Sequence, residues 1–330
     1  MSSDHVAPGG PDAQGGPDAR PGLRTVVVTG ASAGLGYQAA EQLAVAGHRV
    51  VLATRNPEKA AAAERSIRSV VPDASLEHVH LDLADLDSVR AAADSLSTMG
   101  PVHAVLNNAG VVGSRELRST AQGYELQIGT NHLGHFAWTG LVLPMLQATG
   151  GRVVHLGSIS HRWATLDRND PLGAGYYNGY RQYARSKLAV MLFGFELAQR
   201  LADAGSAVSS VVAHPGLALE SLTGTPATVS PSRPGPSRPR PSRSEPSWIG
   251  PGQRFVAQGK DAGAVPLVHA SVGDDVRSGE YWGPDGWFQL RGRASVVPAE
   301  PRAHDRHEAA RLWTASETAS GVTFALDALG

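Results

Sequence analysis

"TVVVTGASAGLG", residues 25–36, joins a run of β-branched residues to a turn with glycines at positions 30, 34 and 36. The Ala- and Leu-rich sequence that follows predicts a helix from about Tyr37. Glycines let the backbone turn sharply and approach a pyrophosphate, whose charge the amides at a helix N-terminus stabilise. A tight turn without a ligand would use similar residues, but the strand before it and the helix after it favour a dinucleotide-binding loop.

Short β-branched runs recur along the chain, separated by stretches of helical length. Strands that alternate with helices form βαβ units, which build a parallel sheet. We therefore predict an α/β fold: a single Rossmann-type, doubly wound parallel sheet of about seven strands, flanked by helices. Ligands bind beyond the carboxyl ends of such strands, so the residues after each run are candidate site residues. The predicted strands lie in "RTVVVT" (24–29), "HRVVLAT" (48–54), "EHVHLDL" (77–83), "VHAVLN" (102–107), "RVVHLGS" (152–158), "AVSSVVAH" (207–214) and "GEYWGPDGWFQLRG" (279–292).

The end of the second predicted strand indicates which dinucleotide binds. NAD-binding proteins usually have an acid there, about 20 residues after the glycines, that accepts hydrogen bonds from the ribose 2′-hydroxyl. Residues 53–56 are Ala, Thr, Arg and Asn, so no carboxylate is present. Arg55 instead offers a permanent cation to a 2′-phosphate, although a solvated surface arginine is the alternative. We predict NADP(H) in preference to NAD(H).

The segment "YARSK", residues 183–187, places a tyrosine four residues before one of only three lysines in the chain. Apolar residues at helical spacing, from Leu188 to Phe195, predict one buried stripe of a helix. At i and i+4 the Lys187 ammonium would lie beside the Tyr183 phenol and stabilise its phenolate. We therefore expect Lys187 to lower the pKa of Tyr183 from its ordinary value of about 10, which would make Tyr183 a general acid and base.

Several motifs occur together and in one order. "TGASAGLG" (29–36) is followed by "LDL" (81–83), "NNAG" (107–110) and "YARSK". On these residues the chain resembles the short-chain dehydrogenase/reductase family, from about Arg24 to Ser221 and again from about Phe255 to the C-terminus. "NHLGHF" (131–136), the 25-residue step from Ser158 to Tyr183 and "LWTASETASGVTF" (312–324) are similar to its retinol-dehydrogenase-like and protochlorophyllide-reductase-like branch.

The resemblance implies an enzyme that interconverts a carbonyl and an alcohol by hydride transfer. Tyr183 would protonate the developing alkoxide, Lys187 would also bind the nicotinamide ribose hydroxyls, and Ser158 would donate to the substrate oxygen, with Ser160 as a neighbouring candidate. Asn131 would hold a water molecule that links the lysine to solvent, or would be a buried structural amide. The residues expected to bind the cofactor are Gly30, Ser32, Gly34, Leu35, Gly36, Arg55, Asp82, Leu83, Asn108, Ala109, Gly110, Tyr183, Lys187, Pro215 and Gly216.

The composition limits the class of protein. The chain has 330 residues, a formal net charge of −1 and no cysteine, which argues against nucleic-acid partners and excludes disulfides and thiolate metal sites. Residues 1–23 have no apolar run and are predicted to be a disordered leader before a single domain, residues 24–330. We expect a cytoplasmic protein that acts on a small molecule, with no metal site and no membrane partner; homo-oligomerisation is left open.

The chain departs from the family pattern after "HPG" (214–216), which should lie near the nicotinamide. Glu220 stands where many members have threonine, and a carboxylate there would repel a pyrophosphate. Either Ser221 would take the place of that threonine or the loop would turn differently, so neither residue is a predicted site residue. A Pro-Ser pair recurs every five residues from Pro231, and residues 225–252 contain eight of the 22 prolines. This segment is predicted to be a flexible Pro-rich loop in the region of the substrate lid. It would be a lid over a bulky substrate, a strip that a partner protein recognises, or a neutral insertion.

Aromatic residues around the predicted site favour an apolar substrate of moderate size. Two other functions would share the cofactor site: a non-catalytic NADPH sensor that presents the Pro-rich loop to a partner, and an epimerase or double-bond reductase. The four polar residues at the predicted catalytic centre argue against the sensor, which has no evident need for a tuned phenol. The aromatic candidates for the pocket, for each of which ordinary core or turn packing is the alternative, are Trp163, Tyr176, Tyr177, Trp282, Trp287 and Phe288.

Overall fold

The computed structural model describes residues 22–113, 116–173, 175, 177–219 and 257–326. Apart from residues 22 and 23, the predicted leader (1–23) lies outside the described residues, as does the predicted Pro-rich loop (225–252).

The main sheet has eight strands within the described residues, in the order β10-β9-β6-β5-β4-β1-β2-β3. Neighbouring strands from β3 to β9 are parallel, and β1 lies between β2 and β4, with Val27 paired to Val51 and Val105. The strand order reverses at β1 and β4, where doubly wound sheets bind their ligands. The strands are β1 (Thr25–Thr29), β2 (Arg49–Thr54), β3 (Leu76–His80), β4 (Ala104–Asn107), β5 (Arg152–Leu156), β6 (Ser209–Ala213), β9 (Tyr281–Pro284) and β10 (Ala294–Val296).

The prediction of a parallel, doubly wound sheet of about seven strands is confirmed, and the described residues add an eighth strand. The seven expected runs contain β1 to β6 and β9, whereas the additional strand, β10, pairs with β9 in antiparallel register. With three residues, β10 is too short to show a periodic pattern. A separate two-stranded sheet, β7 (Ala218–Leu219) with β8 (Gln258–Gly259), was also not predicted.

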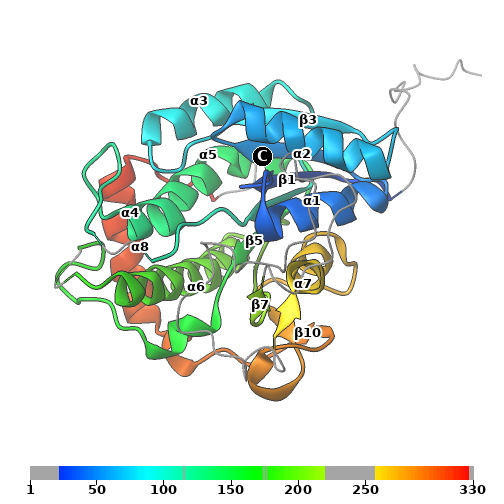
Figure 1. Cartoon of the computed structure of the whole chain (residues 1–330). Coiled ribbons are helices and arrows are strands. Elements are labelled where there is room, and N and C mark those ends of the chain that lie inside the picture. Colours follow the sequence, from blue (N-terminus) through cyan, green and yellow to red (C-terminus); the bar gives the residue numbers. More distant parts are fainter. Residues whose placement is uncertain (1–21, 114–115, 174, 176, 220–256, 327–330) are drawn as a thin grey trace, which may run out of the picture.

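Helices cover both faces of the sheet (Figure 1). On one face lie α1 (Gly34–Val45), α2 (Pro57–Val70) and α7 (Lys260–Val272). On the other lie α3 (Leu86–Ser97), α5 (His135–Gln147) and α6 (Gly179–Asp203), and α8 (Arg306–Ser320) packs against α6. Short helical segments complete the described chain: α4 (Leu126–Ile128), the π-helix η1 (Gly129–Gly134), and the 3₁₀ helices η2 (Ile159–Trp163), η5 (Trp287–Gln289) and η6 (Pro301–His304).

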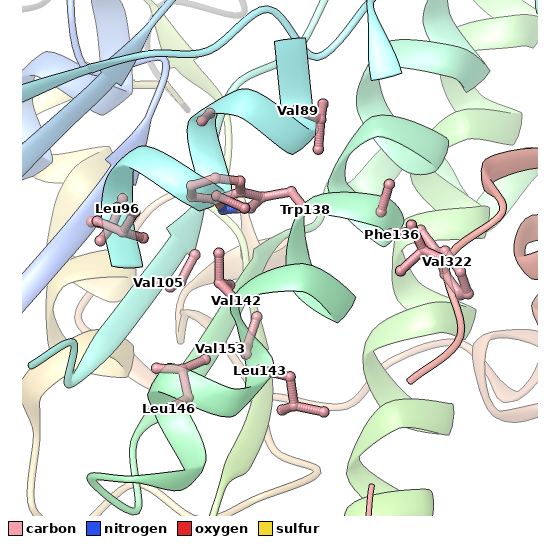
Figure 2. Close-up of a cluster of buried hydrophobic side chains, with 14 of the residues drawn as sticks. Val89, Leu96, Val105, Phe136, Trp138, Val142, Leu143, Leu146, Val153 and Val322 are labelled. Carbon is pink, nitrogen blue, oxygen red and sulfur yellow. The ribbon is translucent and has the colours of Figure 1, made fainter. Parts of the chain in front are cut away.

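Two apolar clusters bury the two faces of the sheet. Figure 2 shows the cluster under α3 and α5, where Phe136 and Trp138 are fully buried. The centre of the Phe136 ring lies 5.2 Å from that of the Trp313 ring and 4.9 Å from that of the Phe324 ring. The segment from α8 onward therefore packs against this cluster. None of the helices in the described parts of the chain is long and apolar enough to cross a membrane.

Candidate active site

The glycine loop between β1 and α1 packs directly on the segment that follows β4. A Cβ atom on Gly30 would lie 2.9 Å from the Ala109 Cα, and one on Gly36 would lie 2.3 Å from the Asn108 Nδ2. Gly30 and Gly34 also have positive φ angles, 68° and 61°, which favour glycine. The loop therefore needs its glycines for close approach and for backbone conformation.

Thr29, which the sequence reasoning did not select, joins these two segments. Its Oγ1 accepts hydrogen bonds from the backbone N–H groups of Asn108 and Ala109, each at 2.9 Å, and its carbonyl accepts one from Asn108 Nδ2 at 2.8 Å. Its position as the first residue of "TGASAGLG" is the feature of the sequence that could have identified it. The first and fourth strands thus present one rigid edge to a ligand.

The other predicted cofactor residues follow the carboxyl ends of neighbouring strands. Arg55 is exposed directly after β2, and Asp82 lies just beyond β3, where its Oδ1 accepts from the Ala84 N–H at 3.0 Å. Gly110 is exposed after β4, whereas Leu83 is buried. The loop residues Ser32 and Leu35 are partly exposed at the start of α1. This edge, with its open glycine backbone and uncapped first turn of α1, fits a dinucleotide.

Pro215 and Gly216 follow β6 at the same edge of the sheet. Gly216 has φ 65°, and a Cβ atom there would lie 2.3 Å from the Leu290 carbonyl oxygen. Gln258 Nε2 donates to the Pro215 carbonyl at 2.8 Å, which ties this turn to β8. The neighbouring Glu220 lies outside the described residues.

Asn131 lies in the π-helix η1 and is 1% exposed. Its Oδ1 accepts from the Val111 N–H at 2.8 Å, and its Nδ2 donates to the Val111 carbonyl at 3.0 Å and to Ser186 Oγ at 2.9 Å. Asn131 therefore connects the segment after β4 to helix α6, which carries Tyr183 and Lys187. π-Helical turns often occur at functional sites.

His135 holds the carbonyl group of Asn131. Its Nδ1 lies 3.0 Å from that oxygen, and its Nε2 lies 2.9 Å from Thr29 Oγ1. Because a carbonyl oxygen can only accept, Nδ1 carries the ring proton, and Nε2 is then an acceptor for the Thr29 hydroxyl, whose other acceptor is the Leu106 carbonyl at 3.4 Å. Burial lowers the pKa of His135 to about 4, so the ring is neutral at physiological pH.

Ser158 directly follows the end of β5 and caps η2. Its Oγ accepts from the backbone N–H of Ser160 at 3.2 Å and from Ser160 Oγ at 3.0 Å. A hydroxyl that accepts these bonds keeps its own proton for donation. His161 Nδ1 lies 2.6 Å from the Ser158 carbonyl oxygen and fixes the backbone of this turn. Of the two serines, Ser158 is the more exposed, whereas Ser160 is buried.

Tyr183 and Lys187 lie one turn apart on α6, whose N-terminus Asn178 caps. Lys187 is 3% exposed and donates from Nζ to the Leu156 carbonyl at 2.8 Å. Its Nζ lies 5.8 Å from the centre of the Tyr183 ring. Burial lowers the pKa of Lys187 to about 8.

The expectation that the pKa of Tyr183 lies below its ordinary value is wrong for this structure. Burial raises the pKa of the phenol, and a hydrogen bond with the Ser158 side chain only partly offsets this. The physical reason is that the loss of water around the phenolate outweighs a cation whose Nζ is directed to the Leu156 carbonyl. Tyr183 is consequently a protonated phenol at neutral pH and can donate a proton.

The structure divides the aromatic candidates for the pocket into buried and exposed residues. Trp282 is 5% exposed and belongs to the apolar core on the side of α1 and α7, which is the core packing that the sequence left as the alternative. Trp163, Trp287 and Phe288 are well exposed, at 68%, 70% and 62%. Tyr176 lies outside the described residues.

Comparisons with known proteins agree with this geometry. The family model described as short chain dehydrogenase matches residues 24–224. Retinol dehydrogenase 13 of Homo sapiens is 35% identical over 307 residues, covering 91% of this chain and 85% of that protein. Polyprenol dehydrogenase of Mus musculus is 42% identical over 205 residues, covering 60% of each chain.

A solved structure with the same fold also resembles this chain in sequence. An uncharacterized protein from Mycobacterium paratuberculosis has a TM-score of 0.72 and 34% sequence identity, with 91% of this chain and 94% of that chain covered. The chain belongs to the short-chain dehydrogenase family of nicotinamide-dependent oxidoreductases, in its retinol-dehydrogenase-like branch.

Proposed function

We propose that the chain is an NADP(H)-dependent oxidoreductase that interconverts a ketone or aldehyde and an alcohol on an apolar small molecule. The observation that carries this proposal is the position of Ser158, Tyr183 and Lys187. All three lie where β5 and α6 meet at the carboxyl edge of the sheet, beside the edge that fits a dinucleotide.

Each of these side chains would have a separate role in carbonyl reduction. The bound nicotinamide would supply the hydride to the carbonyl carbon. Tyr183, protonated because of its raised pKa, donates its proton to the oxygen as negative charge develops there. Ser158 donates a hydrogen bond to the same oxygen, and the Lys187 ammonium stabilises the phenolate that remains. In alcohol oxidation these proton movements are reversed.

Arg55 is the residue that favours NADP(H). It is exposed directly after β2, next to Asn56, which caps α2 by accepting from the Lys59 N–H at 2.8 Å. An arginine in this position offers a fork of N–H donors to a 2′-phosphate. Residues 53–56 contain no carboxylate to repel that phosphate.

The relatives suggest a class of substrate. Their names refer to retinol and polyprenol, which are alcohols with apolar carbon chains. We infer that an apolar alcohol, or its aldehyde, is the substrate class of this chain, and the exposed aromatic side chains of Trp163, Trp287 and Phe288 provide matching apolar surface. We also propose that the protein is cytoplasmic and that residues 24–330 form a single domain.

The test is the loss of NADPH absorbance with a panel of retinal, polyprenals and smaller ketones, measured for the wild-type protein and for Tyr183→Phe. We expect the variant to turn over at least about 100-fold more slowly, because it lacks the general acid. Tyr124→Phe is the matched control, since that ring packs against the apolar cluster that contains Ile128 and Leu172.

Equal rates for wild type and Tyr183→Phe would disprove the proposed role of the phenol. If the protein bound NADPH but converted no member of the panel, a non-catalytic sensor, an epimerase or a double-bond reductase would become the better interpretation.

A further inference from the structure

Lys260, the first residue of α7, lies beside the glycine loop although the two are more than 200 residues apart in sequence. Its Nζ lies 3.3 Å, and its Cδ 4.0 Å, from the position that a Cβ atom on Gly34 would occupy. Gly34 is the first residue of α1 and has a positive φ angle. The missing Cβ therefore leaves space in front of the N-terminus of α1, and the ammonium of Lys260 borders that space.

The start of α7 is held firmly in this place. One turn beyond Lys260, a Cβ atom on Gly263 would lie 2.8 Å from the Ala218 Cβ, 3.2 Å from Leu35 Cδ2 and 3.3 Å from the Pro215 Cβ. Gln42 Nε2 in α1 donates to the carbonyl of Asp261 at 2.7 Å. Helix α7 thus packs against α1, including its first turn, against β7 and against the turn after β6.

The glycine loop lacks a cation of its own. "TGASAGLG" contains no charged residue. Ala33, the N-cap of α1, makes no side-chain bond to the first turn, which also contains no acidic residue. The backbone amides of this turn can therefore receive an anion, but a pyrophosphate carries about two negative charges and helix amides neutralise only part of them. Arg55 follows β2 and is assigned above to the 2′-phosphate.

We propose that the Lys260 ammonium binds the pyrophosphate of the dinucleotide and supplies the cation that the glycine loop lacks. A compact ammonium on a flexible stem suits a phosphate group as a point charge. The proposal rests on the proposed dinucleotide cofactor, but it concerns the pyrophosphate, which NADP(H) and NAD(H) share. Lys260 and Arg55 should therefore be separable by the choice of ligand.

The experiment measures dissociation constants by the change in nicotinamide fluorescence, for NADPH and for NADH, with the full chain and without substrate. We expect Lys260→Met to weaken both ligands by the same factor, about tenfold to 100-fold, as for loss of a charge-assisted hydrogen bond. Arg55→Met should weaken NADPH alone. Adenosine 2′-monophosphate, which has no pyrophosphate, should compete equally well in Lys260→Met and wild type. Arg65→Ala, which removes an exposed charge on α2, is the control.

Three results would overturn the proposal. Unchanged NADPH and NADH affinities in Lys260→Met would show that the ammonium does not contact the cofactor. A loss confined to NADPH would place Lys260 at the 2′-phosphate instead. If Lys260→Met unfolds at a lower temperature than wild type, Lys260→Gln is measured, and unchanged affinities for it decide against the proposal. A wild-type protein that binds neither dinucleotide would instead disprove the proposed cofactor itself.

Discussion

Lys187 is a cation enclosed by protein, and burial lowers its pKa to about 8. Carbonyl reduction needs the charged ammonium beside the phenol, while burial keeps the pKa of Tyr183 above its ordinary value. We therefore expect kcat/KM for reduction to be level below about pH 8 and to fall about tenfold per pH unit above it, because kcat/KM reports the free enzyme. The measurement is the pH profile between pH 6 and 10.

Lys187→Arg provides the comparison for this profile. The guanidinium of this variant stays charged throughout this pH range, so kcat/KM should no longer fall above pH 8. Its pH-independent kcat/KM should be lower than that of the wild type, because a planar guanidinium replaces a compact ammonium. A wild-type profile that remains level to pH 10 would contradict the assignment of the fall to Lys187.

At the scale of single elements, the π-helix η1 determines the geometry around Asn131. The backbone N–H of His135 bonds to the His132 carbonyl, and the His135 ring Nδ1 takes the carbonyl of Asn131 instead. The pattern of apolar residues could not reveal the change, because all six residues of η1 are buried and no polar face marks the period.

Gly134 allows this π-helix to approach the segment after β3. A Cβ atom on Gly134 would lie 2.3 Å from the Leu83 carbonyl oxygen, which is backbone and cannot rotate away. Alanine usually stabilises a helix by about 1 kcal/mol relative to glycine. Here the energetic cost of overpacking should exceed that gain. We therefore expect Gly134→Ala to lower the free energy of unfolding, measured by urea denaturation, by about 2 kcal/mol.

Gly129→Ala is the matched control on the same π-helix. Its Cβ atom would meet the Thr120 methyl group, a side-chain atom that can rotate, so we expect a smaller loss of stability. Equal effects of the two substitutions would show that the backbone contact at Leu83 is not what requires Gly134.

At the scale of the whole molecule, four buried histidines make folding sensitive to acid. His132, His135, His155 and His214 are at most 2% exposed, and burial lowers their pKa values to about 3, 4, 3 and 3. Above pH 6.5 these rings are neutral in both the folded and the unfolded chain. Between pH 6.5 and about 4 the unfolded chain takes up protons that the folded chain cannot, so stability falls as the pH falls.

Each of these rings should reduce the free energy of unfolding by up to about 1.4 kcal/mol per pH unit in this window. We expect the urea midpoint to drop steeply from pH 6.5 to pH 5. His132→Gln should make the decrease of the urea midpoint shallower, and the glutamine amide can replace the contact of the His132 Nε2 with Ser316 Oγ. Substitution of the exposed His307 should leave the decrease unchanged. An equal midpoint at pH 5 and pH 8 would refute this account.

Much of the fold could be predicted from local sequence patterns. The runs that became the central strands β1, β2, β4, β5 and β6 are largely apolar because parallel strands are buried on both faces, whereas the edge strand β3 is only half-buried and its run contains charged and histidine residues. The glycine loop and the Tyr183–Lys187 pair were recognised because each is short and its spacing reflects local chemistry, whereas the segment after β4 was recognised from the resemblance to the family. By contrast, β10 was missed because three residues show no period.

The sequence by itself determined the βαβ alternation, the order of the site motifs and the pairing of Tyr183 with Lys187 on one helix. These follow from periodicity and spacing, which act between neighbours in the chain. Only the tertiary structure decided the direction of the Tyr183 pKa shift, the bonds of Thr29 and His135, and the position of Lys260 beside Gly34. The physical reason is that desolvation and long-range hydrogen bonds depend on which distant segments exclude water from one another, and no local pattern records those partners.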